Sequence, residues 1–324
     1  MKAVVYHEYG SPDVLRIEDI EKPATGDNEV LIKVRAAALN PLDWHFMRGI
    51  PYFLRLMLGV RKPKFIRLGV DVAGVVEAAG SKVAEFKPGD AVFGACRGAF
   101  AEYATTAADA VALKPDNVTF EQAAGVGVAA FTALQALRDK ANIQPGQKVL
   151  INAAAGGVGT LAVQIAKWFG VEVTGVCSSR NVDLVKSLGA DHVIDYTKAD
   201  CTQGTQQYDA IFDLAGNHSF SEFRRVLKPT GIFLGAAGSR DRWMLGFFGS
   251  VIAELVVAPF RSQKRAIIMA KSSKPDLNLM HDLMKSGKVT PVVDRSYKLS
   301  EAAGAMRYLE EGHARGKVVL ALES

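Results

Sequence analysis

A glycine-rich turn between an apolar run and an amphipathic segment is the stretch of this chain best suited to chemistry. Residues 149–151 (VLI) predict a buried strand, and apolar side chains then recur at helical spacing: Val158, Leu161, Ala162, Ile165 and Phe169. A helix N-terminus offers unpaired N–H groups and a positive dipole end, and residues with small side chains let a ligand approach the backbone. With a further strand at 171–177, this unit predicts a site for a dinucleotide pyrophosphate, formed by Ala154, Gly156, Gly157, Val158 and Gly159.

The end of the second strand indicates which dinucleotide is bound. NAD-binding proteins usually place Asp or Glu there for the ribose hydroxyls, and this chain instead has Ser178, Ser179, Arg180 and Asn181. Two hydroxyls, an amide and a guanidinium suit a 2′-phosphate, which favours NADPH. The alternative is that these residues are only a solvated entry to the next helix, since Ser and Asn are common there.

Length and composition set limits on the rest. The chain has 324 residues, 49% hydrophobic and 23% charged, which predicts a globular protein of two domains. Its net charge of +5 comes without a block of basic residues, so no nucleic-acid partner is expected. The three cysteines are far apart and form no CxxC pair, which argues against a disulfide framework. With no export signal at the N-terminus, we expect a cytoplasmic protein.

The order of the elements predicts two kinds of domain. Short strands separated by turns are expected over residues 30–34, 72–78, 91–93 and 101–105. Near residue 120 the pattern becomes helical, with Thr119 and Gln122 as a capping box ahead of a helix over 123–137. From residue 148 strands and helices alternate, which is typical of a parallel sheet covered on both faces.

An apolar segment at residues 243–260 carries flanking Arg and Lys residues and resembles a membrane-interacting element. Glu254 and Pro259 lie inside it, and its length is barely enough to span a bilayer. A packed helix, lid or subunit contact is the preferred interpretation, with an interfacial element as the alternative. We also expect that this segment and residues 50–68 form an apolar cover favouring a bulky hydrophobic substrate.

Several motifs together resemble a known family, the zinc-independent quinone oxidoreductase branch of the medium-chain dehydrogenases/reductases, which includes enone and alkenal reductases. The motifs are ALNPLD at 38–43, GVDVAG at 69–74, AAAGGVG at 153–159, VQIA at 163–166, LGAD at 188–191, IDY at 194–196 and GKVV at 316–319. The resemblance implies an α/β fold, in which a doubly wound parallel Rossmann sheet accompanies a GroES-like β-rich catalytic domain. It places the catalytic domain at residues 1–122, completed by 274–324, and an NADP-binding domain at 123–273.

The same resemblance bears on metal binding. Zinc-dependent members of the superfamily hold a catalytic metal through Cys, His and Cys, and the matching positions here are Asn40, Val70 and Val128. Two valines cannot ligate zinc, and the four-cysteine structural zinc loop is missing, so no metal is expected. Without that Lewis acid, hydride transfer to a substrate activated by conjugation is favoured over alcohol oxidation.

The resemblance also implies roles for individual residues. Asn40 would lie beside the nicotinamide ribose and substrate, with Asp43 orienting its loop, although both could simply cap and shape that loop. Further cofactor contacts are implied for Thr132, Tyr196 at the 2′-phosphate, Leu214, Ala215, Gly216, Gly235, Ala236, Ala237 and Lys317. A helix hydroxyl bonded to its own backbone is the alternative for Thr132, and a solvated strand lysine is the alternative for Lys317.

The function expected is hydride transfer from NADPH to an enone, alkenal or quinone, in other words to a small hydrophobic carbonyl or quinone substrate. Asn40 is a possible donor to the carbonyl oxygen and Tyr52 a possible proton source, although Tyr52 lies in an apolar stretch where it could only pack. The alternatives are a zinc-type alcohol dehydrogenase, a non-catalytic NADPH-binding protein and a membrane-surface protein. A homodimer is expected by analogy alone.

Overall fold

The computed structural model describes residues 1–236 and 262–322 of the chain. The expected apolar segment at 243–260 and the expected site residue Ala237 lie outside these residues. The chain divides into two compact units, one formed by Met1–Phe131 and Ser272–Ser324, the other by Thr132–Lys271. The expected first boundary, between residues 122 and 123, lies earlier in the chain than the division of the structure.

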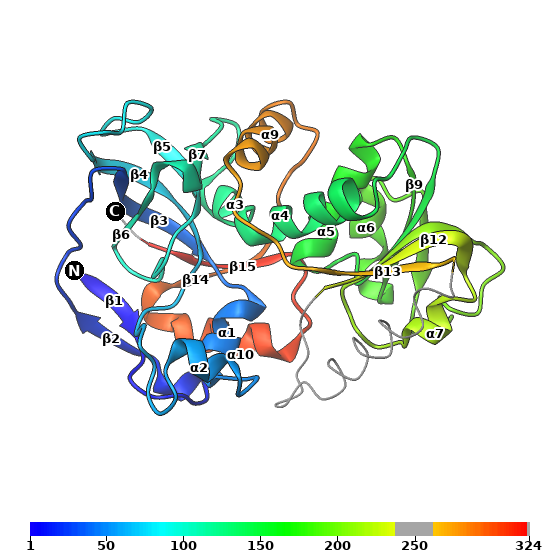
Figure 1. The fold of residues 1–324 in the computed structure, drawn as a ribbon, viewed down its shortest axis with the longest axis horizontal. Helices are drawn as coiled ribbons and strands as arrows, with labels where there is room; N and C mark the ends of the chain where they lie inside the picture. Colours follow the sequence, from blue (N-terminus) through cyan, green and yellow to red (C-terminus); the bar gives the residue numbers. More distant parts are fainter. Residues whose placement is uncertain (237–261, 323–324) are drawn as a thin grey trace. The chain divides into compact units, whose positions relative to one another are not determined.

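The first unit is built on a mixed sheet of seven strands, in the order β14-β15-β3-β4-β5-β7 with β6 paired to β3. Figure 1 shows β15, drawn in red, beside β3, drawn in blue, although they come from opposite ends of the chain. A small antiparallel pair, β1 with β2, completes the strands of this unit. Their bounds are β1 Lys2–Val5, β2 Arg16–Asp19, β3 Glu29–Ala38, β4 Asp71–Ala79, β5 Ala91–Ala95, β6 Tyr103–Ala107, β7 Val111–Leu113, β14 Val293–Lys298 and β15 Lys317–Ala321.

Helices of the first unit pack on this sheet. Helix α3 (Phe120–Ala124) contacts β3, β4 and β5, and it begins at the predicted capping box, with Thr119 Oγ1 accepting from the Gln122 N–H at 3.2 Å. The expected helix over 123–137 is divided in the structure, because α3 ends at Ala124 before α4 (Gly127–Gln135) begins. The remaining helices of the unit are α1 Pro41–Arg48, α2 Leu54–Leu58, α9 Lys274–Lys285 and α10 Ala302–Glu311.

The second unit is a parallel six-stranded sheet in the order β10-β9-β8-β11-β12-β13. This is the doubly wound arrangement expected from the alternation of strands and helices. Helix α5 (Gly157–Trp168) packs on β8 and β9, and α6 (Val182–Ser187) packs on β9 and β10. The other bounds are β8 Lys148–Asn152, β9 Glu172–Cys177, β10 His192–Asp195, β11 Tyr208–Asp213, α7 Phe220–Phe223, β12 Leu227–Ala236 and β13 Lys264–Ile268.

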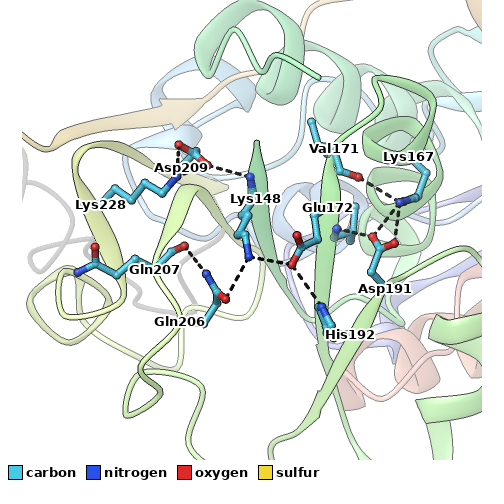
Figure 2. A network of polar contacts seen from close by, with 11 residues as sticks. Lys148, Lys167, Val171, Glu172, Asp191, His192, Gln206, Gln207, Asp209 and Lys228 are labelled. Atoms are coloured by element: carbon cyan, nitrogen blue, oxygen red, sulfur yellow. Dashed lines mark hydrogen bonds and ion pairs between the residues drawn. The ribbon is translucent and has the colours of Figure 1, made fainter. Parts of the chain in front are cut away.

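The amino ends of these parallel strands carry a network of charged residues (Figure 2). Glu172 at the start of β9 lies 3.2 Å from Lys148 Nζ and 3.3 Å from His192 Nε2, and Asp209 accepts from the Lys148 N–H at 2.8 Å. Such partly exposed pairs contribute little stability each, although they fix the relative positions of neighbouring strand ends. The network therefore belongs to the edge of the sheet opposite the glycine-rich turn, where ligands of open α/β sheets do not bind.

Candidate cofactor-binding and catalytic residues

The glycine-rich turn connects the carboxyl end of β8 to the first turn of α5. Gly156 is the N-cap of this helix in an extended conformation, and no side chain of the described residues caps it. The Thr160 N–H already donates to the Gly156 carbonyl at 2.9 Å, so it is the N–H groups before it that lack an intrahelical acceptor. An uncapped helix N-terminus with small residues around it is suited to an anion such as a pyrophosphate.

The two key glycines of the turn are needed for different reasons. A Cβ at Gly159 would lie 2.1 Å from the Ala153 carbonyl oxygen, so close packing of helix and strand requires glycine there. A Cβ at Gly156 would meet nothing closer than that same oxygen, at 3.4 Å. Packing alone therefore does not require glycine at position 156. The lack of a side chain there would let a ligand approach the backbone.

Polar side chains at the carboxyl ends of β8 and β11 hold the neighbouring turns. Asn152 Nδ2 donates to Asp213 Oδ1 at 2.9 Å, and that oxygen also accepts the N–H groups of Ala215 and Gly216 at 3.1 Å each. Asp213 is in register with Asn152 on one side and with Gly235 on the other. The structure thus brings residues 214–216 and the strand end at Gly235 and Ala236 to the same sheet edge as the glycine-rich turn.

The residues expected to bind a 2′-phosphate lie at the end of β9, with a carboxylate that sequence reasoning missed. Asp195, at the end of β10, is in register with Cys177 and accepts from the Ser179 hydroxyl at 2.5 Å. Hydrogen bonds from Ser179 and Thr197 lower the pKa of Asp195 to about 2. An ionised carboxylate from the neighbouring strand therefore lies beside the residues at 178–181, which the types of those four residues alone did not indicate. The signal was the IDY motif itself, which ends the third strand of the unit.

Asn181 and Tyr196 complete this end of the sheet. The Asn181 side chain is buried, and its Nδ2 donates to Ser178 Oγ at 3.2 Å. Its Oδ1 has no hydrogen-bond partner among the described residues, a costly state for a buried polar atom that a hydroxyl donor of a ligand would relieve. Tyr196 is 53% exposed and available to a ligand. These residues fit the adenosine end of a dinucleotide.

A buried polar cluster forms the second candidate site, within the first unit. Asn40, the N-cap of α1, donates from Nδ2 to Asp71 Oδ2 at 2.9 Å and accepts from Lys317 Nζ at 2.6 Å. Lys317 Nζ lies 3.4 Å from the same Asp71 oxygen, and the other Asp71 oxygen accepts the Val128 N–H at 2.8 Å. Asn40, Asp71 and Lys317 are each at most 5% exposed. Sequence reasoning found Asn40 and Lys317 but not Asp71, which joins them.

Asp43 holds the backbone next to this cluster in place. Its two carboxylate oxygens accept the Asn40 N–H at 2.8 Å and the Gly69 N–H at 3.0 Å, which holds the loop before α1 against the strand β4. Complete burial raises the pKa of Asp43 to about 7, and the Asp71 charge adds to this while the two N–H donors and Lys317 oppose it. Asp43 is thus a positioning residue whose charge depends on pH near neutrality.

The three positions that match zinc ligands do lie together around Asp71. Asn40 and the Val128 N–H both bond to its carboxylate, and Val70 directly precedes it. The amide of Asn40 is already engaged, and the valines carry no donor atom for a metal. Burial raises the pKa of the nearby Cys96 thiol far above its usual range. Within residues 1–236 and 262–322, the one grouping of three metal-binding side chains is Asp200, Cys201 and His218, in the second unit.

Tyr52 and Thr132 are not members of the clusters described above. Tyr52 lies in the turn before α2, where the Arg55 guanidinium carbon is 4.9 Å from the centre of its ring. Thr132 lies within α4 and is the first residue of the second unit. Their proposed roles, as a proton source and as a cofactor contact, remain predictions.

Comparison with known proteins places this geometry in a family. Residues 26–116 match the alcohol dehydrogenase GroES-like domain, and residues 188–320 match a family described as zinc-binding dehydrogenase. The chain is 35% identical over 336 residues to the NADPH-dependent alkenal/one oxidoreductase of Arabidopsis thaliana chloroplasts, covering 99% of this chain and 79% of the relative. The chain belongs to the quinone oxidoreductase and alkenal/one oxidoreductase branch of the medium-chain dehydrogenase/reductase superfamily.

Solved structures agree with this assignment. The quinone oxidoreductase of Coxiella burnetii superposes with a TM-score of 0.87 at 32% identity, over 100% of this chain and 99% of that one. The Escherichia coli quinone oxidoreductase complexed with NADPH superposes with a TM-score of 0.83 at 25% identity, over 99% and 100% of the two chains. The expected family and fold, a GroES-like domain with a Rossmann-like parallel sheet, are therefore confirmed. The protein is an oxidoreductase of a family that uses a nicotinamide cofactor.

No described helix is long and apolar enough to cross a membrane. The cytoplasmic location expected from the sequence stays a prediction, as does the homodimer.

Proposed function

We propose that this protein transfers hydride from NADPH to α,β-unsaturated carbonyl compounds or quinones without a catalytic zinc ion. The bound dihydronicotinamide would supply the hydride. The turn at residues 153–159 would hold its pyrophosphate against the N-terminus of α5, and Arg180 would bind the 2′-phosphate.

The observation that carries the proposal is the set of side chains around Asp71. An amide and two valines stand where zinc-dependent members of the superfamily have metal ligands, and Asp71 itself accepts hydrogen bonds from Asn40, Lys317 and Val128. A carboxylate that already has an ammonium and two N–H donors has little need of a metal ion. The substrate must then be one that accepts hydride without metal activation, such as a conjugated carbonyl or quinone.

The buried cluster also offers a way to stabilise the charge that develops on the substrate oxygen. Lys317 donates to Asn40 and Asp71, and an ammonium has three N–H donors. The Asn40 amide group donates to Asp71 at 2.9 Å and to the Ala38 carbonyl at 3.4 Å, so both of its N–H groups have acceptors. Lys317 is thus better placed than Asn40 to donate to an oxyanion, and a proton from solvent or a side chain would complete the reduction.

The test is cofactor oxidation by the purified protein with a panel of acceptors, combined with metal analysis. We expect NADPH to be oxidised by alkenals, enones or quinones, with less activity from NADH and with zinc far below one ion per chain. Oxidation of simple alcohols that requires stoichiometric zinc would contradict the proposal, and so would the absence of turnover with every acceptor.

Lys317→Met tests the role of the ammonium. We expect kcat to fall by at least ~10-fold, because one charged donor to an oxyanion is typically worth more than 1.4 kcal/mol. Asp71 would lose its partner, so thermal unfolding must show that the variant is folded at the assay temperature. The control is Lys288→Met, an exposed lysine after α9, for which we expect unchanged turnover.

A further inference from the structure

A projecting loop of the first unit exposes large apolar side chains to solvent. Across α2 and the residues that follow it, Leu56 is 74% exposed, Met57 73%, Val60 64% and Phe65 50%. Isolated exposed apolar residues are common, but four within ten residues of one loop are not. We call residues 53–65 the apolar loop.

The apolar loop is held in this shape by the fold. Tyr9 donates its hydroxyl to the Gly59 carbonyl at 2.7 Å, and the Lys64 N–H closes the loop onto the Leu58 carbonyl at 2.7 Å. Gly59 has a φ of +115°, and a Cβ there would lie 2.1 Å from the Lys62 carbonyl oxygen. The exposed side chains are therefore carried on a closed, supported turn, and their exposure is a property of the fold.

The charged residues of the apolar loop itself are all basic. Between Asp43 and Asp71 the sequence contains no acidic residue. Arg61, Lys62 and Lys64 are exposed within the loop, and the exposed Arg97 places its guanidinium carbon 5.0 Å from the centre of the Phe65 ring. Arg55 differs, because it turns inward to donate to the Gly49 carbonyl at 3.0 Å and to lie over the Tyr9 ring.

We propose that the apolar loop binds peripherally to anionic lipid membranes, with its exposed apolar side chains in the interface and Arg61, Lys62 and Lys64 at the headgroups. Apolar side chains flanked by Lys and Arg are typical of interfacial membrane elements. Protein interfaces are instead depleted in lysine, and an acid-free loop complements an anionic surface. The proposal concerns where the protein binds and stands independently of the reaction that it catalyses.

Co-sedimentation of the full-length protein with vesicles tests the proposal. We expect binding to vesicles of mixed phosphatidylglycerol and phosphatidylcholine, and at least ~10-fold weaker binding to phosphatidylcholine alone or at high salt. The triple variant Arg61→Gln, Lys62→Gln, Lys64→Gln is expected to lose most of the binding to anionic vesicles. No binding of the wild-type protein to anionic vesicles would overturn the proposal.

Two single substitutions give a matched comparison. Met57→Gln removes an apolar side chain from the loop, whereas Met269→Gln removes one that is 79% exposed and lies after β13 in the other unit. We expect a loss of several-fold in vesicle affinity for Met57→Gln alone, with both variants folded by circular dichroism. Equal affinities of the two variants would overturn the proposal. A change of molar mass in solution caused by Met57→Gln would also overturn it, since the loop would then be a subunit contact.

Discussion

Asp71 and Asp43 are two buried carboxyl groups with different partners. Asp71 is paired with the Lys317 ammonium, whereas Asp43 has backbone N–H donors and a pKa raised to about 7 by burial. A buried charge without a counter-ion is unfavourable, so protonation of Asp43 stabilises the folded state. The cluster therefore holds one ion pair beside one group that titrates near neutral pH.

Asp43→Asn is expected to change how stability depends on pH. In wild type the pKa is about 7 in the folded state and about 3.9 in an unfolded chain, so the folded state binds the extra proton between these values. The contribution of Asp43 is thus largest below about pH 4 and falls by up to ~1.4 kcal/mol per pH unit as the pH rises towards 7. The variant has no titratable group at this position. Burying its amide lowers the free energy of unfolding by an amount that does not change with pH.

Chemical unfolding from pH 4 to 8 measures this difference. The stability advantage of wild type over Asp43→Asn should shrink as the pH rises. A difference between wild type and Asp43→Asn that is constant over this range would contradict the raised pKa.

Asp195→Asn is expected to strengthen NADPH binding. The change removes an ionised carboxylate beside the proposed 2′-phosphate site and frees the Ser179 hydroxyl to donate elsewhere. Removing the repulsion between this carboxylate and a phosphate, which solvent screens in part, should tighten NADPH binding several-fold and leave NADH binding little changed. Titration calorimetry with both cofactors measures it.

The chain contains a matched control for this prediction. Asp200 bonds to the N–H and hydroxyl of Thr202 at 2.8 Å each, as Asp195 bonds to the N–H and hydroxyl of Thr197 at 3.0 and 2.7 Å. Asp200→Asn should therefore disturb a similar local motif without changing cofactor selectivity. Equal effects of the two variants on NADPH binding would argue against a phosphate beside Asp195.

At the scale of elements, the junction of β8 and α5 contains one glycine that packing requires and another that packing does not require. Ala153 adopts a left-handed φ of +63° just before the turn, and Gly159 packs directly against its carbonyl. A Cβ at Gly156, only a few residues away, would make a single contact, at 3.4 Å from the same carbonyl oxygen. One short turn thus contains a position that is constrained by packing and another that the fold leaves free.

Gly156→Ala should therefore weaken cofactor binding, whereas Gly159→Ala should lower the stability of the fold. We expect Gly156→Ala to keep the melting temperature of wild type and to weaken NADPH binding at least ~10-fold, because its Cβ would project to where the pyrophosphate approaches the backbone. Gly159→Ala should lower the stability by ~1–3 kcal/mol through its clash with Ala153. Thermal unfolding with and without NADPH measures both. Wild-type affinity in Gly156→Ala would contradict a pyrophosphate at this turn.

Strands β8, β9 and β11 of the second unit could be predicted from the sequence because each is a mostly buried run, and the periodic helix α5 follows β8. The strands β2 and β14 could not, since they carry mostly exposed or half-buried polar side chains. Asp71 and Asp195 were missed for a related reason. Their roles depend on which strands are neighbours in the sheet. The spacing of residues along the sequence does not predict how strands that are distant in the chain pair with one another.

At the scale of the whole molecule, the two units are assembled differently along the chain. The six strands of the parallel sheet all come from residues 148–268, whereas the sheet of the first unit needs β15 between β14 and β3. The first unit therefore has a higher contact order, with its two ends joined through a strand pair. Loss of the last strand should affect the two units unequally.

A chain that ends at Ala314 is expected to lose the fold of the first unit and retain that of the second. It lacks β15 and Lys317, so β3 loses a neighbour and Asp71 loses its counter-ion. Hydrogen exchange should show loss of amide protection in β3 and β4, with β8, β9 and β11 still protected. A control chain that ends at Leu322 keeps all of β15. Full protection of β3 in the shorter chain would contradict the prediction.

Lys317 also has a consequence for biosynthesis. The Asp71 carboxylate with which it pairs is translated 246 residues before it. Until Lys317 has been made, Asp71 in a nascent chain has no ammonium group with which to pair. The inserted unit can therefore complete its fold during translation, while the unit that encloses it must wait until β15 and Lys317 have been made, which reverses the usual N-terminal-first order of domain folding.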